Sequence, residues 1–175
     1  MKCDMHNDIR GYALRPFAIK EMETSKLRFS VNEIFYSSSK KDVIRGMHFQ
    51  LPPCSQGKMV NVVKGKIIDV LLDLRIDSPT YGKFISIELE EGDGKVVYIP
   101  QGLAHGFASL ANESVVLYLF DSPYSPQSDS GIRYDSFGYK WRIREPSLSN
   151  RDLGFVSFEE FASSFKMEED LGEFS

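Results

Sequence analysis

The feature that most limits the fold of this chain is a series of short apolar runs separated by turn-forming residues. The run MVNVV is followed by KGK and then by IIDVLLDL, and further runs cover residues 81–89, 96–99, 107–110 and 114–120. Runs of roughly five to eight residues with turns between them are typical of an antiparallel barrel or sandwich. No long helical period interrupts them. Gly65 and the segment EGDG at 91–94 predict tight hairpin turns.

Two more strand candidates precede this series. Residues 29–36 alternate apolar and polar side chains and are followed by a polar turn over 37–42. Residues 43–50 form the second candidate, closed by Pro52 and Pro53. Strict alternation in this second strand puts Arg45 and His48 on opposite sides.

The two ends of the chain differ from this pattern. Residues 1–9 are polar, and we expect a loose start. Residues 10–17 predict a short extended piece, because a proline disfavours helix at the residue before it. Residues 157–165 predict a short C-terminal helix with phenylalanines on one face, Ser157 as N-cap and Glu160 at capping-box spacing. The acidic tail, 168–175, is expected to fray. We therefore predict one all-β domain over residues 1–175 with a short C-terminal helix.

Composition excludes several classes of partner. The net charge of −4 argues against a nucleic acid or an anionic membrane, although Arg45 and Lys58 leave a small anionic ligand open. Cys3 and Cys54 are far apart and have no zinc-type companions, so we interpret both as free thiols in a reducing compartment. No window has the length and apolarity of a membrane span or a signal peptide. These features predict a soluble cytoplasmic protein.

The segment from Pro100 to His105 has the spacing P-x-G-x-x-H. It resembles the second motif of the cupin superfamily, whose fold is a jelly roll, or double-stranded β-helix, with this histidine facing the barrel interior. Metal-binding cupins add two histidines one residue apart and a glutamate, because a divalent ion needs three or four converging ligands. Here His48 is followed by Phe49 and Gln50. We therefore expect no metal and no cofactor, with His48 and His105 available for proton chemistry.

Longer motifs narrow the resemblance. They are RGMHFQ, QGK, DVLLDLRxxSPTYGK, IPQGLAHGF, LY followed by YSP, and GIRYD, within residues 10–152. Together they resemble the dTDP-4-keto-6-deoxyglucose 3,5-epimerase family of the rhamnose pathway. The resemblance implies a cofactor-independent epimerase of a nucleotide-diphosphate-linked 4-keto sugar, in a homodimer formed by strand exchange.

The chemistry of such a reaction accounts for the residue types. A 4-keto sugar loses a proton from C3 or C5 to give an enolate, so inversion needs a base on one face, a donor on the other and a cation at the oxygen. The resemblance implies that His48 is the base, Tyr118 the acid, Asp152 the carboxylate that orients the base, and Lys58 the cation. Tyr118 as an ordinary core aromatic is the alternative.

The resemblance also implies a set of substrate-binding residues. Arg45 suits the diphosphate, because a guanidinium pairs well with phosphate oxygens, and Arg10 and Arg151 assist it. Gln56 lies in the QGK motif, and His105 is expected beside the sugar, with a buried structural histidine as the alternative. Tyr124 is at the position that stacks on the nucleobase, and Asp129 replaces a base-contacting glutamate; surface-loop residues are the alternative for both.

Departures from the family pattern leave the substrate open. Arg15 stands where the family has Glu, and Glu33, Ile34 and Phe35 stand where it has Gln-Asp-Asn, in segments expected to reach into the neighbouring subunit's site. A cytidine-diphosphate sugar and an epimerase restricted to C3 or C5 are therefore competing hypotheses. A metal-dependent cupin oxygenase or isomerase is another. A non-catalytic sugar-nucleotide binding module is a third, which Tyr118 and Asp152 argue against.

Overall fold

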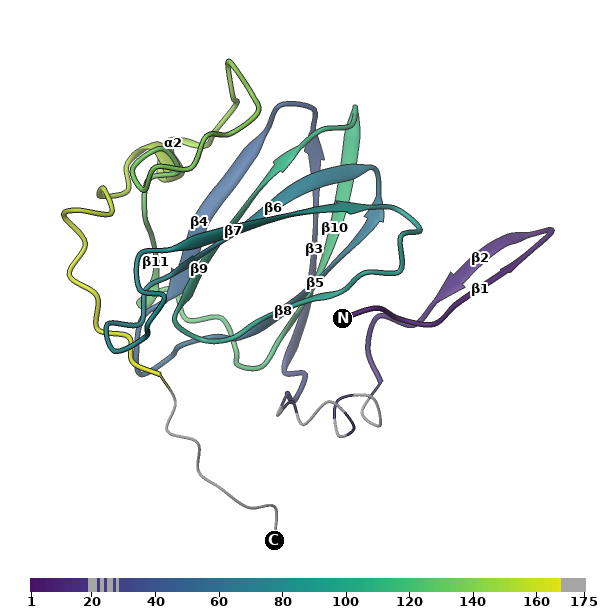
Figure 1. Ribbon diagram of the computed structural model, residues 1–175, viewed down its shortest axis with the longest axis horizontal. Coiled ribbons are helices and arrows are strands. Elements are labelled where there is room, and N and C mark those ends of the chain that lie inside the picture. Colours follow the sequence, from purple (N-terminus) through teal and green to yellow (C-terminus); the bar gives the residue numbers. More distant parts are fainter. Residues whose placement is uncertain (19–21, 23, 25–26, 28, 168–175) are drawn as a thin grey trace, which may run out of the picture.

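The computed structural model describes residues 1–167 except 19–21, 23, 25–26 and 28. Two β-sheets lie face to face and form an open barrel (Figure 1), in agreement with the all-β prediction. The four-stranded sheet has the order β3-β10-β5-β8, all neighbours antiparallel: β3 (Glu33–Lys40), β10 (Glu113–Phe120), β5 (Lys58–Lys64) and β8 (Val97–Ile99). The five-stranded sheet has the order β11-β4-β9-β6-β7, also antiparallel: β11 (Asp129–Gly131), β4 (Ile44–Gln50), β9 (Leu103–Ser109), β6 (Lys66–Asp73) and β7 (Phe84–Glu90).

The core between the two sheets is built by the inward-facing side chains of both. Phe107 of β9, Ile67 of β6 and Val60 of β5 are fully buried and belong to one cluster that also includes Tyr118. Burial of this apolar area supplies the main driving force for closing the sheets on each other. The same closure leaves one end of the barrel lined by polar side chains.

The strand positions agree with the sequence pattern, but two predicted hairpins are wrong. β5 pairs with β8 and β10, whereas β6 pairs with β7 and β9, so these consecutive strands lie in different sheets. Gly65, with φ of 78°, carries the chain from one sheet to the other within a single residue. The 91–94 segment likewise joins strands of different sheets, β7 and β8.

The predicted turn at 37–42 is also wrong, because β3 continues to Lys40. Ser37 and Ser39 are buried and pair in register with Val116 and Ser114 of β10. A serine-rich segment has the composition of a turn. Here the inward-facing positions of the strand are serines rather than apolar residues, so the sequence pattern did not indicate a strand.

The start of the chain is ordered rather than loose. β1 (Met5–Asp8) and β2 (Gly11–Leu14) form a hairpin that extends away from the barrel (Figure 1, purple). Cys3 is buried, and its amide donates to the Gly94 carbonyl at 2.7 Å. Within the described residues, this hairpin pairs with no other sheet.

The C-terminal helix lies earlier than predicted. Helix α2 (Asn150–Leu153) is one turn long and begins after Ser149, whose hydroxyl accepts the amide of Asp152 at 3.1 Å. Residues 157–165 form a turn and then an irregular segment, although Glu160 does accept the Ser157 amide at 3.0 Å. The predicted phenylalanine face is used differently, because Phe161 and Phe165 pack on Phe49 at centroid distances of 5.1 and 5.4 Å. The tail at 168–175 lies outside the described residues.

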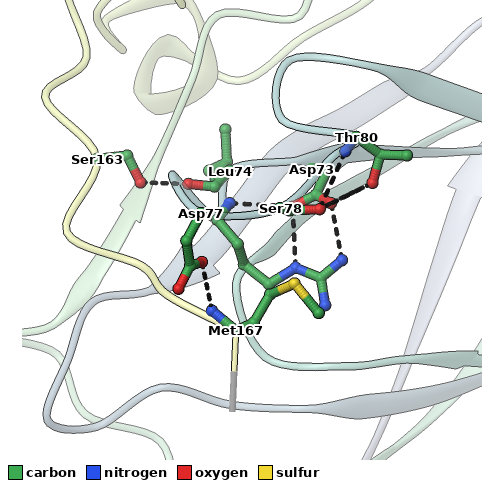
Figure 2. A network of polar contacts seen from close by, with 8 residues as sticks. Asp73, Leu74, Asp77, Ser78, Thr80, Ser163 and Met167 are labelled. Carbon is green, nitrogen blue, oxygen red and sulfur yellow. Dashed lines mark hydrogen bonds and ion pairs between the residues drawn. The ribbon is translucent and has the colours of Figure 1, made fainter. Parts of the chain in front are cut away.

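The loop after β6 is tied together by Asp73 (Figure 2). Its carboxylate accepts hydrogen bonds from Arg75, Ser78 and Thr80, each at 2.7 to 2.9 Å. Burial alone would raise the pKa of Asp73, but these donors outweigh it and hold the pKa far below its ordinary value. The network therefore explains the DLRxxSPT motif as a structural one.

Among the described residues, no helix has the length and apolar character needed to cross a lipid bilayer.

Candidate active site

A cavity of about 450 Å³ opens between the two sheets at the polar end of the barrel. Most of the side chains predicted from the sequence line it: Arg45, His48, Gln56, Lys58, His105, Tyr118, Tyr124, Asp129 and Arg151. Asp152 contacts His48, and Arg10 lies elsewhere. The cavity wall also has an apolar part, which the sequence analysis did not predict. It is formed by Phe35, Phe49, Phe107 and Phe120.

Strand β4 brings Arg45 and His48 to the same cavity, which contradicts the strict alternation predicted for it. The pairing of β4 with β9 shifts register between these two residues. Gly46 lies at the shift with φ of 128°, and a Cβ there would come within 2.5 Å of Gly106 Cα. Because only glycine fits this backbone, the irregularity is encoded by the RGM part of the motif.

His48 is paired with Asp152. Its Nε2 lies 2.9 Å from Asp152 Oδ1, and the carboxylate is 4% exposed. Burial lowers the pKa of His48, the Asp152 carboxylate opposes this, and Arg151 and Lys58 lower it further. An ionised Asp152 accepts the Nε2 proton, so the neutral imidazole keeps its lone pair on Nδ1, which has no hydrogen-bond partner in the described part of the chain. This arrangement is that of an oriented base.

Tyr118 comes from the other sheet. It is 7% exposed and is surrounded by three rings: Phe35 at 5.7 Å, Phe120 in parallel at 5.8 Å and His105 edge-on at 6.0 Å. Burial raises the pKa of its phenol, and the Asp69 carboxylate acts in the same direction. The phenol therefore stays protonated over the whole neutral range, as a proton donor requires.

Lys58 is 6% exposed, with its ammonium 5.8 Å from the centre of the Phe120 ring. Burial lowers its pKa to about 8, against the attraction of Asp69, Asp129 and Asp121. Lys58 is still a cation at neutral pH. Because its side chain is buried, its attraction for an anion in the cavity is screened only weakly by water.

A second histidine–carboxylate pair lies deeper in the barrel. His105 Nε2 is 2.5 Å from Oδ1 of Asp69, and both side chains are buried. Asp69 Oδ2 has no hydrogen-bond partner among the described residues. The sequence search missed Asp69, although a single acid inside the apolar run IIDVLL is a detectable signal, since a buried carboxylate needs a partner. No group of three His, Cys, Asp or Glu side chains in the described ranges has the geometry of a metal site.

The remaining cations differ in position. Arg45 donates from Nε to Ser39 Oγ at 2.8 Å and from Nη2 to the Ser38 carbonyl at 3.0 Å, which fixes the guanidinium at the cavity wall. Arg151 donates to Asp129 Oδ1 at 2.7 Å. Arg10 lies in the β1–β2 turn and pairs with Asp8 at 2.5 Å, outside the residues that line the cavity of its own chain.

Comparison with known proteins shows the family to which this chain belongs. The family model described as dTDP-4-dehydrorhamnose 3,5-epimerase matches residues 1–160. The chain belongs to this family. The epimerase from Shigella flexneri is 35% identical over 156 residues, covering 86% of this chain and 85% of that protein.

Solved epimerase structures share the fold. The crystal structure of the dTDP-4-dehydrorhamnose 3,5-epimerase from Bacillus anthracis, with TDP and pyrophosphate bound, has a TM-score of 0.87 and 32% identity, covering 89% of this chain and 91% of that one. A 3′-monoepimerase from Streptomyces bikiniensis in complex with dTDP-quinovose has a TM-score of 0.84 and 28% identity, covering 90% and 81%. The predicted cupin-type jelly roll is thereby confirmed, as is the class of enzyme, a nucleotide-sugar epimerase.

Two residues of strand β3 at which the sequence departs from the family pattern lie at the cavity. Glu33 and Phe35 line the cavity of their own chain. Glu33 accepts the backbone amide of Tyr124 at 2.8 Å, and Phe35 packs on Tyr118. Gln56, predicted to bind substrate, lines the cavity but uses its amide to donate to the Ser122 carbonyl at 2.6 Å.

Proposed function

We propose that this enzyme inverts C3, C5 or both in a dTDP-linked 4-keto-6-deoxyhexose, for deoxysugar and surface-polysaccharide synthesis. One observation carries the proposal: His48, oriented by Asp152, and Tyr118 line the same cavity from different sheets, β4 and β10. A base and a donor on facing walls suit a reaction in which hydrogen leaves one face of a ring and returns to the other.

In the first step, His48 Nδ1 takes the proton from the carbon next to the ketone. The C–H electrons form the enolate, and the negative charge moves to the C4 oxygen. Lys58 stabilises this charge, because a buried ammonium in a largely apolar cavity interacts strongly with an anion. Asp152 stabilises the imidazolium that forms.

In the second step, Tyr118 donates its phenolic proton to the same carbon from the opposite face. The enolate electrons form the new C–H bond and the ketone returns. Tyr118 then regains a proton, and His48 releases the one it took, both by exchange with water. Only protons move, so the redox state of the sugar is unchanged.

Residues on the cavity wall are suited to bind the diphosphate and the nucleoside of the substrate. Arg45 and Arg151 supply cations for the diphosphate, and Tyr124 offers a ring for the nucleobase. His105 is proposed to lie beside the sugar with Asp69 behind it. TDP and dTDP-quinovose bound to the related structures support a thymidine nucleotide.

A homodimer with strand exchange is part of the proposal. The β1–β2 hairpin extends from the barrel, and Ile9 at its tip is fully exposed. In a dimer this hairpin would bring Arg10 to the partner's cavity. The proposal keeps the enzyme in the cytoplasm, because no disulfide joins Cys3 and Cys54.

The proposal is tested with dTDP-4-keto-6-deoxyglucose in deuterated water. Mass spectrometry and proton NMR should show deuterium at C3, at C5 or at both, with an epimerised product. The CDP-linked analogue, run in parallel, should react more slowly. A protein that exchanges neither substrate would contradict the proposal.

A further inference from the structure

The segment that carries Tyr124 is held at its backbone by side chains from distant strands. Glu33 of β3 accepts the Tyr124 amide at 2.8 Å. Gln50 of β4 accepts the next amide, that of Ser125, at 2.7 Å and donates to the carbonyl of Pro123 at 3.3 Å. Two consecutive amides are thus bound by side chains from two different sheets, so the backbone at Tyr124 has a defined direction.

The other end of Tyr124 is held as well. Its hydroxyl donates to Asp129 Oδ2 at 3.0 Å, while Asp129 Oδ1 accepts from Arg151 at 2.7 Å. Both oxygens of Asp129 are therefore engaged within the protein. The Tyr124 side chain nevertheless lies on the cavity wall and is 55% exposed. A ring that is fixed at its backbone and its hydroxyl but open on its surface is suited to stack on another planar group.

We propose that Glu33 is a positioning residue for nucleotide binding, acting through the amide of Tyr124. This inference rests on the proposed function, since it takes the planar group on Tyr124 to be the base of a nucleoside diphosphate. Glu33 keeps the Tyr124 ring in place before the ligand arrives, so less conformational freedom is lost on binding.

The charge of Glu33 is otherwise difficult to explain. A carboxylate on the wall of a cavity that binds a diphosphate repels the ligand. A carboxylate that accepts an amide makes a stronger hydrogen bond than a neutral acceptor does. Hydrogen bonding to Tyr124 thus gives this acid a role at a position where the family pattern has an amide.

Binding of dTDP alone, followed by calorimetry, tests the inference without requiring turnover. Glu33→Ala is expected to weaken binding about fivefold to tenfold, the effect of losing one such hydrogen bond. Glu33→Gln keeps an acceptor oxygen, and its weaker hydrogen bond is offset by loss of the charge that repels the diphosphate, so binding should stay within about twofold of the native protein. Glu160→Ala is the matched control, because Glu160 also accepts a backbone amide, that of Ser157, away from the cavity. Thermal unfolding verifies that each variant is folded.

A double-mutant cycle locates the effect. In a Tyr124→Ala background, the further change Glu33→Ala should leave dTDP affinity unchanged, because the ring that Glu33 positions is absent. With sugar substrate, Glu33→Ala should raise KM and leave kcat within about twofold. Native or tighter dTDP binding by Glu33→Ala would overturn the inference, as would equal losses in Glu33→Ala and Glu33→Gln, or additive effects in the cycle. A native protein that binds dTDP but exchanges no sugar hydrogen would contradict the proposed function alone.

Discussion

Asp152 uses both of its carboxylate oxygens on strand β4. Oδ1 lies 2.9 Å from Nε2 of His48, and Oδ2 accepts the amide of Gly46 at 3.1 Å. Gly46 is the residue at which the register of β4 shifts and brings Arg45 and His48 to one cavity. One acid from helix α2 therefore contacts both His48 and the backbone irregularity that places His48 in the cavity.

Replacing this acid with an amide should alter both the tautomer of His48 and the charge beside it. In Asp152→Asn, the amide nitrogen can face His48 Nε2, which favours the wrong tautomer and removes the charge that stabilises an imidazolium. We expect kcat to fall about 100-fold to 1,000-fold with KM changed less than about threefold. Steady-state kinetics measures this, with circular dichroism to verify the fold. Unchanged kcat would show that Asp152 does not support the base.

The activity should depend on pH through two groups. Burial lowers the pKa of His48 below its ordinary 6.5, so kcat/KM should rise on the acid side with a midpoint below that value, as the imidazole becomes a free base. Lys58 has a pKa of about 8 and loses its charge above it, so kcat/KM should fall on the alkaline side near pH 8. In Lys58→Arg the alkaline fall should disappear, because arginine keeps its proton. An alkaline limb that persists unchanged in this variant would contradict the role of Lys58.

Removing the phenol should separate exchange from inversion. In Tyr118→Phe, His48 still takes the proton and returns it, or one exchanged with water, to the same face. We expect epimer formation to fall about 100-fold or more, while deuterium still enters the recovered substrate. NMR of product and recovered substrate distinguishes the two. Native levels of inverted product would mean that another group is the donor.

Much of the fold could be predicted from the sequence because short apolar runs bounded by turn residues are a local signal. Ile67, Val70 and Leu72 are all fully buried in β6, where the apolar run placed a strand. Cavity residues such as His48 and Lys58 were instead predicted from the resemblance of their motifs to those of a known family.

The misses involve relationships that a local pattern does not contain. Whether Gly65 closes a hairpin or moves the chain to a second sheet depends on the partners that β5 and β6 find later in the chain. Phe158 and Phe165 have helical spacing, yet packing against the barrel holds them in an irregular segment. The run IIDVLL indicates that Asp69 is a buried acid, but it does not identify the partner of that acid, His105, which is 36 residues away.

The Asp73 network should contribute to stability rather than to catalysis. Asp73→Asn removes the charge and replaces Oδ2, which accepts from Arg75, Ser78 and Thr80, with an amide nitrogen that cannot accept. We expect a loss of about 3 kcal/mol in the free energy of unfolding. Because the pKa of Asp73 is lowered in the folded state, this advantage of the native protein should shrink as pH falls below about 4.

Urea unfolding measures that loss. Asp135→Asn is its control, since Asp135 forms an exposed ion pair with Arg133 and its replacement should cost less than about 0.5 kcal/mol. Equal losses in the two variants would mean that the buried network adds no more than a surface pair.

The central claim is that His48 removes a carbon-bound hydrogen from a 4-keto sugar, and solvent deuterium uptake measures this step directly. The native enzyme should incorporate deuterium at C3 or C5 of dTDP-4-keto-6-deoxyglucose, and His48→Ala should do so at least about 100-fold more slowly while still binding dTDP. Deuterium uptake by a folded His48→Ala variant at the native rate would contradict the claim.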